Sequence, residues 1–145
     1  MLDANSIVSG TIVAVGVSAQ ILDAARAEQF ALITSRDIVT EVLRTLARPR
    51  VQRKYPVGSA EIGQLRFLLE HDALLVPLSV DVHGVATHPE DDRILATAAS
   101  GNAQYIVTGD RQLQKLGSFG DVAIVSPRQF LAILQAELDG DQDLY

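Results

Sequence analysis

The sequence predicts a single α/β domain, a three-layer α/β/α sandwich with a central parallel sheet of about five strands. Short runs of aliphatic and β-branched residues alternate with longer stretches in which apolar residues recur at helical spacing. This alternation is typical of βαβ units, which build parallel sheets through right-handed crossovers. At 145 residues the chain is long enough to bury one core without disulfides. We expect residues 1–138 to form the domain and residues 139–145 an acidic, frayed tail.

Five segments are predicted strands because they are short, apolar and rich in strand-forming residues. They are a stub at residues 2–5 and the runs at residues 30–34, 73–77, 105–107 and 122–125. The run at residues 105–107 is followed directly by Thr108, Gly109 and Asp110, which cannot continue a strand. We expect a loop over residues 78–89.

The segments between the strands carry helical patterns. A first pattern begins at Ser6 and is expected to break at Gly16. Ser35 is a predicted N-cap of a helix that ends at Arg48-Pro49. Further helices are predicted from Ser59 to Leu69, from Glu90 to Ala99, around Leu113 to Leu116, and from Ser126-Pro127 onward.

The charge is unevenly distributed. The net charge is −6, which argues against a uniformly basic surface for nucleic acid. Five of the twelve basic residues nevertheless lie within residues 44–54, where no acid occurs: Arg44, Arg48, Arg50, Arg53 and Lys54. Two interpretations of this run remain open: a row of contacts to phosphates, or a solvated helix end favoured by the helix dipole.

Cysteine usage and the N-terminal segment bear on location. The chain has no cysteine, which excludes thiolate metal sites and is typical of a reducing compartment. The apolar run from Ile7 to Ala19 is short for a membrane span, and Asp3 stands where a signal peptide carries positive charge. We therefore expect a soluble, cytoplasmic protein.

Four acids are candidates for one site. Asp3 and Asp110 lie at predicted strand ends, where ligands of parallel sheets bind. Asp92 lies in the first turn of a helix, and Glu41 in the helix after the second strand. Carboxylates gathered at one mouth repel each other unless a cation binds between them. Because the candidates offer only oxygen, a hard ion such as Mg²⁺ or Mn²⁺ is the expected ligand.

Each candidate also has a purely structural interpretation. Asp91 and Asp92 would stabilise a helix N-terminus, and Asp110 would cap the next short helix. Glu41 points roughly 130° away from the apolar stripe of its helix, which favours a solvated position. Asn5 and Thr108 either orient the acids or merely terminate structure. The histidines are expected at the surface, with His88 an outlying candidate near the acids.

Five blocks of sequence occur together in a recognisable order. They are Asp3-Ala4-Asn5, Glu41 in a helix ending at Leu46-Ala47-Arg48-Pro49, Pro89-Glu90-Asp91-Asp92, Tyr105-Ile106-Val107-Thr108-Gly109-Asp110-Arg111, and Ser126-Pro127-Arg128-Gln129-Phe130-Leu131. As a set they resemble PIN-domain proteins, and in particular the toxin components of bacterial toxin–antitoxin pairs. The resemblance runs through nearly the whole chain.

The resemblance implies a metal-dependent endoribonuclease that hydrolyses RNA phosphodiester bonds. By position, Asp3, Glu41, Asp92 and Asp110 match the four acids of the family, which hold one or two Mg²⁺ or Mn²⁺ ions. Asn5 and Thr108 match the polar supports, and the basic run 44–54 is expected to contact RNA. The spacing to Ala96 favours Asp92 over its neighbour Asp91 as the third acid only narrowly, so both remain open. A cognate antitoxin covering the acids and a homodimer are also implied.

Two other functions remain open. An inactive PIN-fold module that binds a protein partner is favoured by the anionic surface and by Ala4, which stands where such proteins commonly carry Thr. A metal-dependent phosphatase of small phosphate esters would use the same acids and would have no need of the basic run 44–54.

Overall fold

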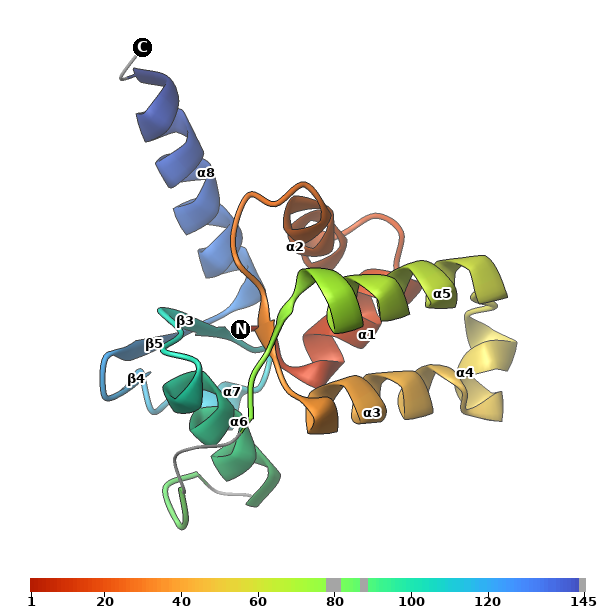
Figure 1. Ribbon diagram of the computed structural model, residues 1–145, viewed down its shortest axis with the longest axis horizontal. Coiled ribbons are helices and arrows are strands. Elements are labelled where there is room, and N and C mark those ends of the chain that lie inside the picture. Colours follow the sequence, from red (N-terminus) through yellow and green to blue (C-terminus); the bar gives the residue numbers. More distant parts are fainter. Residues whose placement is uncertain (78–81, 87–88, 144–145) are drawn as a thin grey trace.

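The computed structural model describes residues 1–77, 82–86 and 89–143, with the side chains of Glu90 and of residues 141–143 excepted. Much of the loop predicted over residues 78–89 therefore lies outside the described residues, as does His88. Figure 1 shows helices packed around short strands, with the N-terminus near the centre and the C-terminal helix leaving the body.

The strands are short and form two small sheets. β1 (Ile33–Thr34) pairs in parallel with β2 (Leu74–Leu75). β5 (Val122–Val125) lies between β3 (Tyr105–Val107), which is parallel to it, and β4 (Ser118–Phe119), which is antiparallel. All five predicted segments thus contain strand or bridge residues. A continuous five-stranded parallel sheet does not form within the described residues, because β1 and β2 contribute only two residues each to pairing.

The N-terminal stub joins the larger sheet. Leu2 forms an isolated parallel bridge with Val107. The Asp3 N–H donates to the Val107 carbonyl at 3.1 Å, and the Val107 N–H donates to the Met1 carbonyl at 2.8 Å. The stub therefore ends beside the carboxyl end of β3, where Thr108 and Asp110 follow.

The predicted break at Gly16 is confirmed. α1 (Ala4–Ile12) and α2 (Val17–Arg26) are bent by 96° with respect to each other. They cross closely at Gly10, where an added Cβ would lie 2.7 Å from the Ser18 carbonyl oxygen. In the part of the chain that the structure describes, no single helix is long and apolar enough to cross a membrane, although this bent pair reaches that length and composition together.

The helix that follows β1 begins and ends as predicted. The Ser35 hydroxyl accepts the Ile38 N–H at 3.2 Å and caps α3 (Arg36–Leu46). The stripe that α3 buries consists of Ile38, Val39, Val42 and Leu46. A short helix that the sequence did not predict, α4 (Pro49–Lys54), follows at once. Pro49 can start this helix because the backbone N–H of a first helical residue has no partner within the helix, so its absence in proline costs nothing.

The remaining helices are α5 (Ser59–Phe67), the π-helical turn η1 (Leu68–Asp72), α6 (Pro89–Ser100), α7 (Arg111–Gln114) and α8 (Pro127–Asp143). The frayed tail predicted from residue 139 is wrong as far as Asp143, since α8 continues through it. Leu138 packs against the core beyond the fully buried Leu134, which extends the helix.

An aromatic cluster attaches α8 to the core. The ring of Phe130, which is 6% exposed, meets the rings of Phe30 and Tyr105 edge-on, with centroids 5.1 Å and 5.8 Å away.

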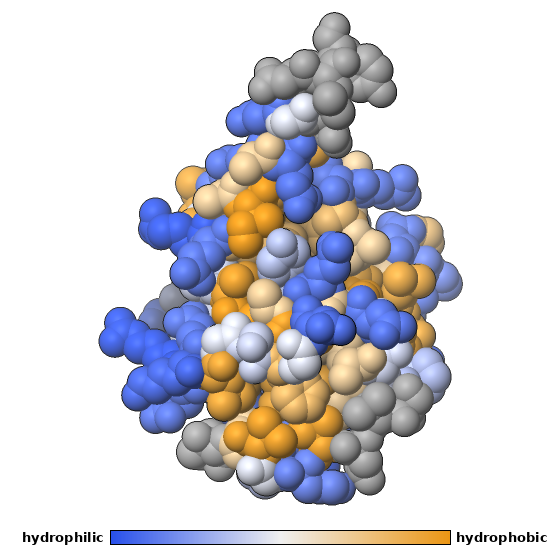
Figure 2. Space-filling model, turned by 90° about the vertical axis from the view of Figure 1, so that its left-hand side faces the viewer, coloured by the Kyte–Doolittle hydropathy of each residue, from blue (hydrophilic) through white to orange (hydrophobic). Residues whose placement is uncertain are grey.

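Figure 2 shows the face of the molecule opposite α4, where apolar residues are interrupted by polar ones over most of the surface.

Candidate functional site

A cleft of about 540 Å³ opens where the strands end. Figure 1 shows α3 and α6 on opposite sides of the start of α1 in this region. Five acids line the cleft: Asp3, Asp37, Glu41, Asp91 and Asp110. Three arginines, Arg44, Arg48 and Arg93, line it as well. The lining also includes the polar side chains of Asn5, Ser35, Thr40 and Thr97.

Asp3 is held in one orientation at the bottom of the cleft. Its side chain is 6% exposed, and it caps α1 by accepting the Ser6 N–H at Oδ1, 2.9 Å away. Its Oδ2 accepts the Thr108 hydroxyl at 2.6 Å. A charged carboxylate with short bonds from two directions has little freedom to rotate. Sequence position alone also allowed Asp3 to be a surface acid, and the structure excludes that interpretation.

Thr108 connects Asp3 with the segment that carries Asp110. The Thr108 hydroxyl accepts the Asp110 N–H at 3.0 Å while it donates to Asp3. Asp110 Oδ1 accepts the Gln112 N–H at 2.8 Å and caps α7. Both interpretations of Asp110 therefore hold, since the residue caps a helix and lines the cleft. Thr108 occupies the supporting position predicted for it, and Asn5 is exposed on the cleft lining.

Glu41 reaches the cleft from the outer face of α3. Asp37, Glu41 and Arg44 follow one another at intervals of four and three residues, which places them along one side of the helix, and Arg48 follows just after the helix ends. This side is exposed, as the angle of Glu41 to the apolar stripe predicted. Because the cleft is open to solvent, Glu41 is both exposed to solvent and part of the cleft lining.

The structure reverses the expected positions of Asp91 and Asp92. Asp92 is 7% exposed and does not line the cleft. Its Oδ1 accepts the N–H groups of Ala86 at 2.7 Å and Val85 at 3.2 Å, and its Oδ2 accepts that of Gly84 at 3.0 Å.

The bond from Ala86 is the largest cause that lowers the pKa of Asp92, and those from Gly84 and Val85 add to it against the opposing effect of burial. Asp91 instead lines the cleft. The Asp92 carboxylate is engaged by the backbone of residues 84–86 instead. Of the two neighbouring acids that the sequence left open, Asp91 is therefore the one that lines the cleft.

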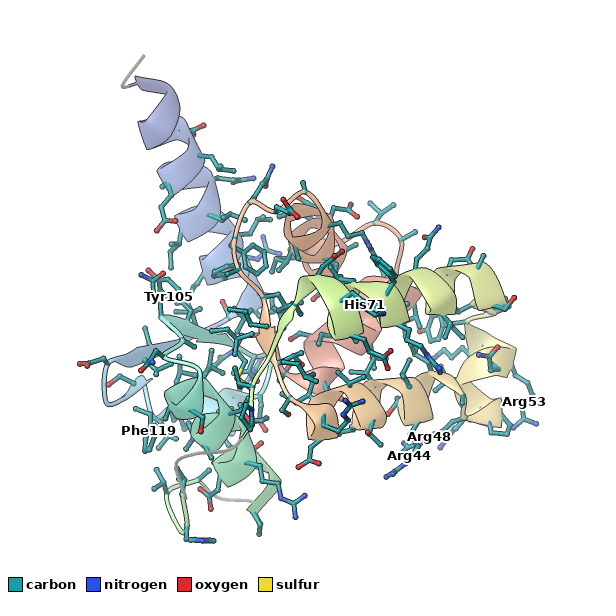
Figure 3. All side chains as sticks on the ribbon, in the orientation of Figure 1. Arg44, Arg48, Arg53, His71, Tyr105 and Phe119 are labelled. Atoms are coloured by element: carbon teal, nitrogen blue, oxygen red, sulfur yellow. The ribbon has the colours of Figure 1, made fainter. Side chains whose placement is uncertain are left out.

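The basic run divides into two parts. Arg44 and Arg48 line the cleft, whereas Arg50, Arg53 and Lys54 are exposed on α4 outside its lining. Figure 3 shows Arg44 and Arg48 next to each other and Arg53 farther along, at the other end of α4. The Lys54 ammonium lies 5.4 Å from the ring centre of its neighbour Tyr55. The predicted row of phosphate contacts thus meets the cleft through its first two members.

Some of the cleft residues had not been identified as candidates from the sequence. Asp37 precedes Glu41 by one helical turn, so it shares a face with a residue already suspected. Ser35 was recognised only as a helix cap, yet it also borders the cleft. Arg93 directly follows the acidic block Pro89-Glu90-Asp91-Asp92, and its position beside this block is the one sequence feature that points to it.

The donor set of the cleft suits a hard divalent cation. The five acids supply only carboxylate oxygens, and the part of the lining that the structure describes contains neither Cys nor His. Asp3 and Asp110 each keep lone pairs beyond those engaged by the protein. Within the described residues, no group of three Asp, Glu or His side chains is close enough to hold one ion as the side chains stand. The residue types therefore fit a metal, while their spacing requires Glu41 or Asp91 to approach the other acids.

The site is an acid-lined cleft at the strand ends of an α/β domain, and the acids of its described lining offer only oxygen as ligand atoms. The model of the PIN domain matches residues 1–112, so the chain belongs to the PIN domain family, whose members are generally nucleases. The match covers every acid and arginine of the cleft. Neither the curated proteins nor the solved structures include a significant match to this chain.

Proposed function

We propose that this protein is a metal-dependent endoribonuclease that hydrolyses phosphodiester bonds of RNA. One observation carries the proposal: acids from four separate segments of a PIN-domain chain line one cleft. Asp3, Glu41, Asp91 and Asp110 are the residues that would hold Mg²⁺ or Mn²⁺, with Asp91 in the place first given to Asp92. Such an ion, when bound, lowers the pKa of water and stabilises negative charge on phosphate oxygens.

The residues of the chain have distinct roles in this proposal. Asp3 and Asp110 are fixed carboxylates, because the Asp3 side chain accepts the Thr108 hydroxyl and the Asp110 side chain accepts the Gln112 N–H. Glu41 is exposed and has no hydrogen bond within the described residues, so it is free to move toward the fixed pair. Arg44 and Arg48 bind the RNA phosphates and offset part of the charge of the acids.

Cleavage of end-labelled RNA tests the proposal. The wild-type protein should cleave in Mg²⁺ or Mn²⁺ and stop in EDTA, and Glu41→Gln should lose the activity while keeping the wild-type melting temperature. Glu137→Gln, an exposed site on α8 outside the cleft lining, is the matched control and should remain active. Metal-independent cleavage, or undiminished cleavage by both Glu41→Gln and Asp110→Asn, would refute the assignment.

The two neighbouring acids of α6 separate catalysis from structure. Asp91→Asn should abolish cleavage, since Asp91 lines the cleft. Asp92→Asn should lower the melting temperature, because its carboxylate holds three backbone N–H groups, yet retain metal-dependent cleavage. The opposite pattern would restore Asp92 as the third acid.

For the biological role we propose a cytoplasmic toxin of a toxin–antitoxin pair that acts as a homodimer. An antitoxin would insert an Arg or Lys among the cleft acids. Induced expression in bacteria should arrest growth with the wild type and not with Glu41→Gln. The product of a neighbouring reading frame should bind the protein, inhibit cleavage and relieve the arrest.

A second candidate is an inactive PIN-fold module that binds a protein partner. The observation in its favour is that no three acids of the described residues stand close enough to hold one ion. Calorimetric titration with Mn²⁺ near neutral pH discriminates the two functions: the nuclease should bind Mn²⁺ and lose affinity in Glu41→Gln, whereas the module should give no binding heat.

A further inference from the structure

Arginines enter the cleft from two sides. Arg93 lines it from the first turns of α6, whereas Arg44 and Arg48 line it from α3 and from the residue that precedes α4. All three side chains are exposed. Among the residues that the structure describes, the Arg93 guanidinium has no ion pair, although carboxylates line the same cleft. Its charge is therefore available to a ligand.

Asp3 and Asp110 lie between these two sources of positive charge. Asp3 belongs to the start of α1, which Figure 1 shows between α3 and α6, and Thr108 connects it to the Asp110 backbone. A small phosphate ester bound above these acids presents one phosphate, so it can contact the arginines on only one side of the cleft. A nucleic acid strand carries a phosphate on every nucleotide. A strand that crosses the acids therefore places neighbouring phosphates at both walls, where guanidinium groups bind them well.

We infer that Arg93 is a substrate-binding residue that holds a phosphate on the opposite side of the scissile bond from Arg44 and Arg48. This inference rests on the proposed nuclease function for its substrate, but its test measures binding and needs no cleavage.

The test is the salt dependence of binding. Fluorescence anisotropy of a short labelled single-stranded RNA is measured in Ca²⁺ over a range of salt concentrations for wild type, Arg93→Ala, Arg44→Ala and the double variant. Loss of one phosphate contact on a single strand should make the slope of log K against log salt less negative by about 0.7. The double variant should change it by about 1.4 if the two sides hold different phosphates. Arg93→Lys should restore most of the slope.

Arg128→Ala is the matched control, since Arg128 is exposed on α8 and does not line the cleft. The inference is overturned if Arg93→Ala behaves like Arg128→Ala, if the double variant loses no more than one single variant, or if no RNA binds. Cleavage by the wild type alongside any of these results would leave the nuclease assignment standing, and the predicted slopes without cleavage would support the inference alone.

Discussion

Removing the Thr108 hydroxyl should destabilise the protein more than the loss of one small polar group would suggest, because this group makes two hydrogen bonds in the site. Thr108 is fully buried, and its hydroxyl donates to Asp3 at 2.6 Å and accepts the Asp110 N–H at 3.0 Å. Thr108→Val keeps the shape of the side chain but removes both bonds. A hydrogen bond to a charged group contributes about 1.5–3 kcal/mol, and a buried N–H left without a partner costs about 1–3 kcal/mol.

The expected loss is about 1.5–5 kcal/mol, because the added methyl group returns about 1 kcal/mol of apolar burial. For a chain of this length that lowers the melting temperature by roughly 5–15 °C. Urea unfolding followed by circular dichroism measures the free energy directly, and the urea slope should not change.

Two variants make the result specific to the bridging hydroxyl. Thr97 is 2% exposed, and its hydroxyl donates to the Arg93 carbonyl one turn earlier in α6, at 2.8 Å. Thr97→Val leaves no carboxylate without a donor and should cost less than about 1 kcal/mol. Thr108→Ser keeps the bridge and should stay close to the wild type. If Thr108→Val and Thr97→Val differ by less than about 0.5 kcal/mol, the bridge does not stabilise the site as described.

Three further predictions concern the frame of the site. The pKa of Asp92 is lowered, so its carboxylate should stabilise the fold fully above the pKa of about 3.9 that it has when unfolded, and progressively less as the pH falls through its lowered folded value. The difference in melting temperature between wild type and Asp92→Asn should therefore shrink in acid, and a constant difference would contradict this. Phe130→Ala should cost about 3–5 kcal/mol in urea unfolding, since the ring is buried in the aromatic cluster; a cost under 1 kcal/mol would show that α8 is held elsewhere. Gly10→Ala should destabilise by about 1–3 kcal/mol because its Cβ would meet the Ser18 carbonyl, whereas Gly63→Ala, with nothing within 4 Å, should stabilise by about 0.4–1 kcal/mol. Equal shifts for the two glycines would exclude close packing as the cause.

Features that depend on neighbouring residues in the chain were predicted well. The break between α1 and α2, the Ser35 cap and the strand before Thr108 follow from local preferences that tertiary contacts did not override. The helix α4 and the extension of α8 through Asp143 were missed. Pro49 follows the end of one helix and also starts the next. Leu138 continues α8 by packing on a core that the sequence pattern does not show.

The choice between Asp91 and Asp92 could not be made from their positions in the chain. Both precede the apolar stripe of α6 and both favour a helix N-terminus. Which one faces the cleft depends on how α6 is rotated against β3 and on the backbone of Gly84 to Ala86, whose N–H groups engage Asp92. Arg93 became a cleft residue through the same rotation.

The sequence by itself determined the α/β class, the order of the elements and the chemical type of the site, because hydrophobic periodicity and the kinds of ligand atom are properties of the residues themselves. Only the tertiary structure decided which acids share the cleft and how far the strands pair. It also decided that arginines enter the cleft from both α3 and α6. These features depend on the rotation and approach of elements distant in the chain, and packing of the whole core sets both.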